Sequence, residues 1–466
     1  MNKRMKDLAY TFSANFLNFL MGFVTGFIIP KFLGIDDYAY LKVFTFYVTY
    51  VGVAHLGLLD GIYIKYGSYN YEDLPQEKFR AYTRSLVIFQ IVEAIILGVI
   101  VSIVIKDSNR SIICFMVILN MIILNITNLF TFIHQFTKRF KLFSINTIIN
   151  KLLYVIGCLF LIYFSMFNYI NFVILQTVIN VLILGIYIYK NKDLVFGKAQ
   201  GLLENFREYK ELIKLGFFVM IGNFMTIIVL GIDRLFIDAF FSLEDFAMYS
   251  FAYTLISLFY ILLNSLTMVL YPYLTRAKEE TYKEVYETIK MAITILMSFT
   301  LCGYFVIKFI VINFIPQYTN SFNILIFLVP TVIYSGHISI LITNYYKVLK
   351  KTKEYTFNNI VALIISIITN IIAYIIFKDV IAIAASTLIS FILWAIYSDL
   401  YFKKILGVKI LKANMLDIGI IVIFIVCAYS FNWLAGMLVY LILIGIFMIL
   451  MIRRDIKKII KIMLKK

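Results

Sequence analysis

Two charged residues, Asp233 and Arg234, stand side by side in an otherwise apolar stretch of the chain. An ionised side chain at the centre of a membrane helix costs about 2.5–3.5 kcal/mol on insertion scales, so it calls for a partner or a watery cavity. Because a guanidinium can hold a phosphate through two parallel hydrogen bonds, both residues are candidates for binding an anionic substrate. The alternative is structural: Arg234 pairs with Asp238 one turn further on, or Asp233 pairs with another helix.

Three more ionisable residues in apolar stretches are candidates for ion coupling: Glu93, Asp60 and His337. A carboxyl group such as that of Glu93 can take up and release a proton, because burial raises its pKa and a nearby cation lowers it. For each residue a structural role stays open. Glu93 could be a neutral acid bonded to another helix, Asp60 an interfacial cap, and His337 a hydrogen-bonded packing residue.

Uncharged polar residues follow helical stripes through several apolar stretches. The candidates for substrate binding among them are Asn15, Asn18, Asn128 and Asn264. Such residues can simply join helices, but their number in each half of the chain favours a wet groove between two lobes. Amide and hydroxyl groups suit the binding of sugars. Lys308 lies near the end of an apolar stretch, where it either reaches the interface or faces the same groove.

These residues have to be positioned by membrane-spanning helices. The chain is 62% hydrophobic with a mean hydropathy of +0.92, which excludes a soluble protein, and its apolar runs are continuous rather than alternating, which favours helices over a β-barrel. We predict about fourteen spans, near residues 8–30, 38–64, 85–105, 111–133, 146–166, 169–189, 215–240, 246–272, 288–311, 322–346, 356–377, 379–402, 415–430 and 433–452.

The basic residues indicate how these spans are oriented. All but seven of the 43 Lys and Arg residues lie before the first span, in or beside every second connection, or in the tail. This positive-inside pattern predicts that both termini are cytoplasmic. The net charge of +17 is spread over short loops, so it indicates orientation and contact with anionic lipids rather than nucleic acid binding.

An internal repeat appears when the chain is shifted by 208 residues without gaps. Residues 32–39, Phe-Leu-Gly-Ile-Asp-Asp-Tyr-Ala, then fall on residues 240–247, Phe-Phe-Ser-Leu-Glu-Asp-Phe-Ala. Six spans separate the two copies, so the repeat is parallel. We therefore predict an N-terminal lobe of six spans in 1–200, a second lobe in 201–402 preceded by an interfacial helix, and two final helices with a basic tail in 403–466.

Several function classes lack their motifs. No GxxxxGK[ST] sequence is present, so we expect no ATP hydrolysis, and HExxH, paired metal-ligand spacings and nucleophile elbows are absent too. We expect no enzymatic activity, no cofactor and no bound metal. The predicted outer connections are also too short to hold the donor and acceptor of a membrane glycosyltransferase or polymerase.

The opening residues 8–39, the run Leu56–Gly61 and the sequence 231–237 resemble the bacterial polysaccharide-biosynthesis flippases of the multidrug/oligosaccharidyl-lipid/polysaccharide exporter superfamily. The chain departs from that pattern at 240–243, where a Gly-rich turn is usual. The resemblance implies an inner-membrane carrier with a MATE-like fold. It would flip an undecaprenyl-diphosphate-linked oligosaccharide by alternating access, for O-antigen, capsule or a related polysaccharide.

Energy for transport, if any is used, has to come from an ion gradient, the membrane potential or consumption of the substrate on the far side. A proton or sodium ion is therefore a candidate partner, and the polysaccharide polymerase machinery is another. Three other functions stay open: an ion-coupled multidrug exporter of the same superfamily, a membrane polymerase or glycosyltransferase, and a structural partner in a membrane complex.

Overall fold

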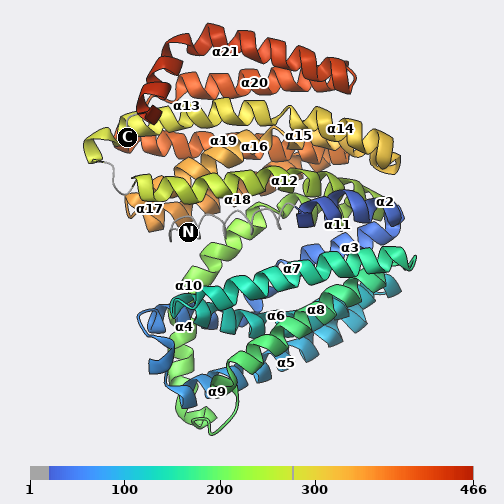
Figure 1. Cartoon of the computed structure of the whole chain (residues 1–466), viewed down its shortest axis with the longest axis vertical. Coiled ribbons are helices and arrows are strands. Elements are labelled where there is room, and N and C mark those ends of the chain that lie inside the picture. The colour runs from blue at the N-terminus through green and yellow to red at the C-terminus, as the bar shows by residue number, and fades with distance from the viewer. Residues whose placement is uncertain (1–19, 275–277, 465–466) are drawn as a thin grey trace, which may run out of the picture. The chain divides into compact units, whose positions relative to one another are not determined.

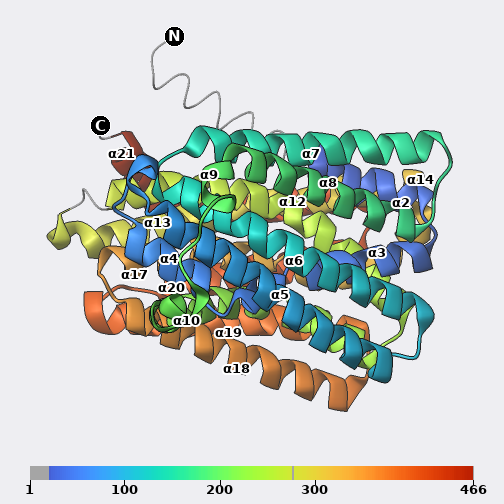
Figure 2. The same ribbon diagram turned by 90° about the horizontal axis from the view of Figure 1, so that it is seen from below.

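The protein is an all-helical membrane protein. The computed structural model describes residues 20–274 and 278–464, apart from the side chains of some helical residues, and this part of the chain contains no β-strand. Within each unit most of the long helices run side by side as rods (Figures 1 and 2). The predicted all-helical class is confirmed.

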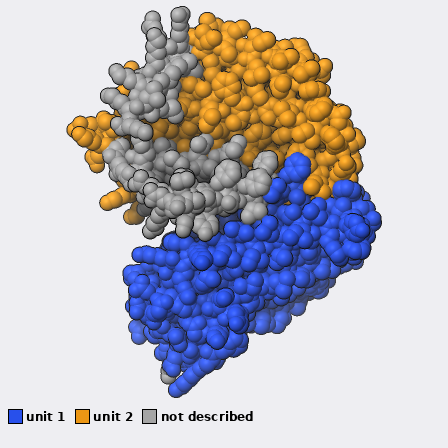
Figure 3. Space-filling model, viewed as in Figure 1, with its two compact units in different colours: residues 1–24, 32–228 blue, residues 25–31, 229–466 orange. Residues whose placement is uncertain are grey.

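The chain folds into two compact units, which Figure 3 shows in different colours. Unit 1 contains residues 1–24 and 32–228, and unit 2 contains residues 25–31 and 229–466. These units are defined by contacts within the fold. The predicted division into 1–200, 201–402 and 403–466 is defined by the repeat, and it stays a prediction.

Unit 1 is organised around one long helix, α6 (Ser108–Phe136). It packs against α3, α4, α5, α7 and α8 and against the short helix η2. Asp107 begins α6 by accepting a hydrogen bond from the Arg110 backbone N–H at 2.6 Å. The other helices are α3 (Ile35–Val48), η2 (Val51–His55), α4 (Leu58–Tyr66), η3 (Tyr71–Asp73), α5 (Gln76–Val104), α7 (Phe140–Tyr163), α8 (Tyr169–Lys190), α9 (Lys192–Val195) and α10 (Leu202–Val229).

Unit 2 has α19 (Val380–Leu406) at its centre, packed against α11, α15, α16 and α18. Helices α18 and α19 pack against each other, and Figure 2 shows them side by side. The remaining helices are η1 (Val24–Ile28), α2 (Ile29–Phe32), α11 (Ile232–Phe240), α12 (Leu243–Leu274), η4 (Glu279–Thr281), α13 (Tyr282–Thr300), α14 (Gly303–Phe314), η5 (Pro316–Tyr318), α15 (Ser321–Leu328), α16 (Thr331–Gly336), η6 (His337–Ile342), α17 (Thr343–Val348), α18 (Thr352–Phe377), α20 (Leu411–Ser430) and α21 (Trp433–Leu464).

Ten helical segments among the described residues are long and apolar enough to cross a membrane. Two further pairs of helices would each make one bent span, with angles of 58° at residues 55–58 and 41° at residues 328–331. Up to twelve spans follow. Most of the predicted first span lies outside the described residues, and the count of fourteen stays a prediction.

The seventh span differs from its prediction. The sequence predicts one helix over 215–240, with an interfacial helix leading into it. Helix α10 runs without a break from Leu202 to Val229, so the amphipathic segment and the first part of the span are one helix. The chain then breaks at Leu230 and Gly231 before α11 begins. The apolar run continues across this break, so composition alone did not reveal it.

The repeat coincides with helix boundaries. One helix ends at Phe32 and the next begins at Ile35, and 208 residues later the same boundaries fall at Phe240 and Leu243. Both following helices carry two acidic residues in their first turn, where the partial positive charge of a helix N-terminus stabilises them. The matched acidic pattern is therefore a helix-start signal that occurs in both copies.

Close contact between α4 and α10 depends on three glycines. Gly57 has a left-handed backbone with φ of 86° and begins α4 directly after the bend. A Cβ atom on Gly216 of α10 would lie 2.0 Å from the carbonyl oxygen of Gly57, and one on Gly61 would lie 2.0 Å from the carbonyl oxygen of Leu212. Small residues allow such close approach of helices in membranes.

We therefore predict that Gly216→Ala lowers the free energy of unfolding by about 1–3 kcal/mol, because the backbone oxygen cannot move away as a side chain could. Thermal unfolding of the purified protein in detergent measures the effect. The matched control is Gly222→Ala on the same helix, where an added Cβ meets no atom within 4 Å. Equal melting temperatures for the two variants would contradict the close packing.

Candidate functional site

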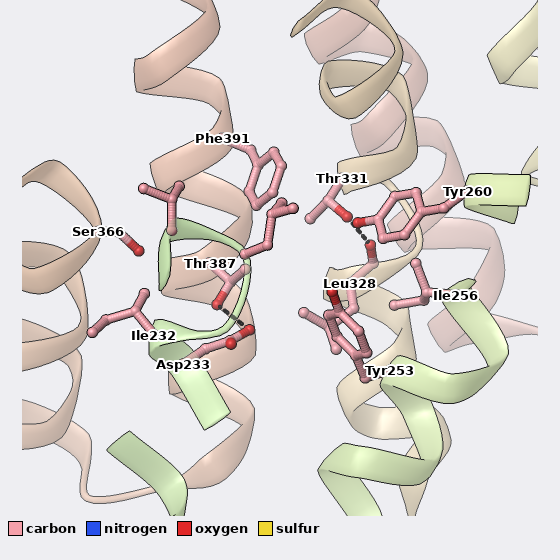
Figure 4. A pocket seen from close by; sticks show the side chains of 12 residues that line it. Ile232, Asp233, Tyr253, Ile256, Tyr260, Leu328, Thr331, Ser366, Thr387 and Phe391 are labelled. Atoms are coloured by element: carbon pink, nitrogen blue, oxygen red, sulfur yellow. Dashed lines mark hydrogen bonds between the residues drawn. The ribbon is translucent and has the colours of Figure 1, made fainter. Parts of the chain in front are cut away.

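Unit 2 contains a pocket at the break between α10 and α11 (Figure 4). Its empty volume is about 340 Å³, including space open to solvent. Tyrosine, threonine, serine and aspartate side chains from five helices provide its polar lining: Asp233, Tyr253, Tyr260, Thr331, Ser366 and Thr387. An apolar stretch of membrane helices thus carries a group of hydroxyls around one acid.

Asp233 is held in place by neighbouring helices. One carboxylate oxygen accepts a hydrogen bond from the Tyr249 hydroxyl at 2.5 Å and one from Thr387 at 3.3 Å. The other accepts from the backbone N–H of Arg234 at 2.8 Å. The side chain is buried, and it links α11 to α12 and α19. These bonds match the structural alternative for Asp233, in which it pairs with another helix instead of binding substrate.

Arg234 lies in the first turn of α11 and is half-buried. Its guanidinium carbon is 3.8 Å from the centre of the Tyr253 ring, in cation–π contact. Tyr253 also lines the pocket, so the cation stands beside the hydroxyl-lined space. Stacking uses the face of a guanidinium, whereas phosphate binding uses the N–H groups at its edge. The edge of the guanidinium is the part that is chemically suited to an anion.

In unit 1 a polar cluster lies at the bend between α3 and α4. Gln90 of α5 donates hydrogen bonds to the Ala54 carbonyl at 3.0 Å and to Glu93 at 2.8 Å. Asn125 of α6 donates to the Val51 carbonyl at 3.0 Å and to Gln90 at 2.8 Å. The two amides satisfy backbone carbonyls of the short helix η2, and Glu93 is attached to the edge of the same network.

Asp60 lies in the first turn of α4, directly after this bend, and is buried. Its carboxylate is 3.8 Å from Nε2 of His55, whose Nδ1 accepts a hydrogen bond from the Gly57 N–H at 3.1 Å. Asp60 and Glu93, both predicted for ion coupling, thus lie on helices that meet at the same bend.

His337 opens the π-helix η6 and is buried. Its Nε2 lies 3.0 Å from Asp417 of α20. A second pair, Lys290 and Asp399, is buried on α13 and α19. Sequence reasoning did not select these three partners. Lys290 is near the start of a predicted span, so the sequence analysis grouped it with the basic residues of the connections. Asp399 and Asp417 lie within the predicted spans 379–402 and 415–430, and an acid in a span is a signal that could have identified them.

The other predicted residues are distributed as follows. Lys308 on α14 donates to the Ala428 carbonyl at 3.4 Å and is half-buried, and Asn128 is half-buried on α6. Asn15 and Asn18 lie outside the described residues, and so does the side chain of Asn264. In the part of the chain that the structure describes, no cluster of three or more His, Cys, Asp or Glu residues could hold a metal ion.

Comparisons with known proteins identify the family. The family model described as "Polysaccharide biosynthesis protein" matches residues 5–278, more than half of the chain, so the chain belongs to this family. No curated protein sequence matched. The resemblance drawn from the sequence is confirmed.

Solved structures show the same fold. The lipid II flippase MurJ in an inward closed conformation is similar with a TM-score of 0.69 and 15% identity, over 96% of this chain and 100% of that chain. MATE in complex with MaD3S has a TM-score of 0.54 and 12% identity, over 87% and 94%. A MOP superfamily transporter from Pyrococcus furiosus has a TM-score of 0.51 and 12% identity, over 84% and 93%. The chain is thus a multi-pass membrane protein with a MurJ- and MATE-like fold, and its family and fold are those of flippases and transporters.

We predict that Asn125→Leu destabilises unit 1 by about 1 kcal/mol for each of its two hydrogen bonds, because the Val51 carbonyl and the Gln90 amide lose their donor. The measurement is thermal unfolding in detergent. Asn128→Leu, one turn further along the same helix, is the matched control. A melting temperature for Asn125→Leu at or above that of the control would show that the bend does not need this amide.

Proposed function

We propose that this protein is a flippase for an undecaprenyl-diphosphate-linked oligosaccharide. It would carry the repeat unit from the inner to the outer leaflet of the bacterial cytoplasmic membrane, by alternating access of two lobes, for O-antigen, capsule or a related surface polysaccharide. The family and the carrier fold support this class of activity. The observation that carries the proposal is Arg234, a membrane-embedded cation beside a hydroxyl-lined pocket.

The chemistry of the pocket fits both ends of such a substrate. A diphosphate needs a cation with several N–H donors, which Arg234 offers. Sugars need hydroxyl donors and acceptors and flat apolar surfaces, and Tyr253, Tyr260 and Thr331 supply both kinds of group. Asn15, Asn18, Asn128, Asn264 and Lys308 are proposed as further substrate contacts.

The polyprenyl chain of the substrate would remain among membrane lipids while its polar head crosses. Exposed apolar side chains line the outer faces of the spans, as on Ile95, Ile103 and Ile375, so a hydrocarbon chain can follow the protein surface without leaving an apolar environment. Only the diphosphate and the sugars then need a polar path.

Energy for the cycle would come from an ion gradient. We propose Glu93, Asp60 and His337 as the ionisable groups that couple a proton or sodium ion to transport. Both termini would be cytoplasmic, as the positive-inside pattern predicts. The flipped product would be in the outer leaflet, which is the face where a polysaccharide polymerase would use it.

The test is Arg234→Ala in a strain whose surface polysaccharide depends on this protein. Loss of two charge-assisted hydrogen bonds to phosphate is expected to reduce surface polysaccharide by about 100-fold or more, because each such bond contributes about 1.5–3 kcal/mol and about 1.4 kcal/mol is tenfold. Lipid-linked oligosaccharide should accumulate on the inner leaflet, and immunoblotting should show the variant inserted at the wild-type level.

Two companion variants sharpen this experiment. Arg234→Lys keeps the charge but not the two-pronged geometry, so it should restore only part of the export. Arg110→Ala removes an arginine from the start of α6, outside the pocket, and should leave export unchanged. Normal polysaccharide in Arg234→Ala would refute the role of this cation, and resistance to drugs that depends on Arg234 would favour a multidrug exporter.

A further inference from the structure

Unit 2 contains two buried pairs of ionisable side chains that come from four helices. Thr294 on α13, one turn after Lys290 of the first pair, donates a hydrogen bond to Asp417 of the second and so connects them. Lys290 lies on α13, His337 on η6, Asp399 on α19 and Asp417 on α20, and each is at most 2% exposed. Positions 290 and 417 are 127 residues apart in the chain, so only the packing of unit 2 makes the cluster.

One half of the cluster is charge-balanced. The ammonium of Lys290 donates a hydrogen bond to one oxygen of Asp399, and the Tyr286 hydroxyl donates to the other at 2.8 Å. Lys290 also donates to the side-chain oxygen of Asn414 at 2.6 Å. One ammonium therefore neutralises one carboxylate, and additional hydrogen bonds fix both groups.

The other half holds a second carboxylate. Asp417 accepts a hydrogen bond from the Thr294 hydroxyl at 2.7 Å, and its other oxygen lies 3.0 Å from Nε2 of His337. When Asp417 is ionised its carboxylate can only accept, so Nε2 then carries the hydrogen and donates to Asp417. This leaves Nδ1, which is buried and has no hydrogen-bond partner among the described residues. It is the nitrogen to which a further proton can be added.

Two ionised carboxylates and one ammonium leave this buried cluster with one negative charge in excess. Removing an uncompensated charge from water is expensive, and it is relieved when an acid and a base within hydrogen-bond distance share a proton. The geometry points to a proton-binding site at His337 and Asp417: the pair takes up one proton at Nδ1 of the imidazole, and the cluster becomes neutral.

The surroundings favour a proton over a metal ion. No group of three or more metal-ligating side chains occurs in the described part of the chain, and both Asp417 oxygens already accept hydrogen bonds. The helices packed around η6 bring other titratable groups near: Tyr334 of α16, whose ring centre is 6.2 Å from that of His337, and Tyr260 of α12, which contacts Ser335. Neither supplies a positive charge to Asp417.

Binding of the proton is linked to helix packing, because the pair joins α20 to the start of η6. A π-helix has a wider turn than an α-helix and commonly marks a functional site. When the pair loses its proton, Asp417 loses its positive partner and the contact between α20, η6 and α13 weakens. That this step drives transport rests on the proposed function. The proton site itself does not.

The test is the pH dependence of stability in the purified full-length protein, without substrate. The wild type should melt several degrees higher at about pH 6 than at about pH 8.5, because the proton bound by the folded pair is lost as pH rises. His337→Gln/Asp417→Asn replaces both groups with neutral amides of similar size, so it should lose this difference while remaining folded. Asp417→Asn alone balances Lys290 against Asp399 and should lose it too.

His134→Gln is the matched control, since His134 is another fully buried histidine, on α6, and faces the Asn191 amide instead of a carboxylate. It should keep the wild-type difference. A wild-type difference in Asp417→Asn or in the double variant would overturn the proton site. Because no transport is measured, that result would leave the flippase proposal standing, and loss of export in Arg234→Ala tests the latter independently.

Discussion

Inside a bilayer every backbone polar group has to find its partner within the protein, and the helix breaks of this chain show where that constraint is hardest to meet. At the bend after α3, the carbonyls of Val51 and Ala54 are satisfied by the amide side chains of Asn125 and Gln90. The break before α11 places the buried carboxylate of Asp233 against the Arg234 N–H. Both breaks therefore have polar side chains that bond to the interrupted backbone.

This coincidence links local structure to function. An unbroken helix presents only side chains to its neighbours, whereas a broken one also presents backbone groups and changes direction. The bend at Gly57 brings Asp60 and Glu93 to the same region of unit 1, and the break at Gly231 gives Arg234 a place beside Tyr253. The π-helix η6 is a third irregular segment, and its first residue, His337, contacts Asp417. A carrier needs segments that can rearrange, and interrupted helices are the segments with the fewest internal hydrogen bonds to lose.

Much of the architecture could be predicted because lipid imposes it. Long apolar runs in a chain of this composition must be helices, and the repeat at a shift of 208 residues predicted helix boundaries that the structure shows at Phe32 and Phe240. Asp233, Arg234 and Glu93 could be selected because a charge in an apolar run is costly. Lys290 was missed because a lysine near the end of a span looks like a loop residue, and its burial depends on Asp399 and Asn414 from helices far along the chain.

The sequence by itself determined the class of the protein, its helical character and the identity of its unusual charges, because these follow from the transfer energies of single residues into lipid. Only the tertiary structure decided which charge meets which partner. The pairing of His337 with Asp417, and of Asp233 with Tyr249 and Thr387, depends on how helices rotate and cross. Rotation and crossing depend on the packing of many side chains at once, and no single stretch of sequence contains that information.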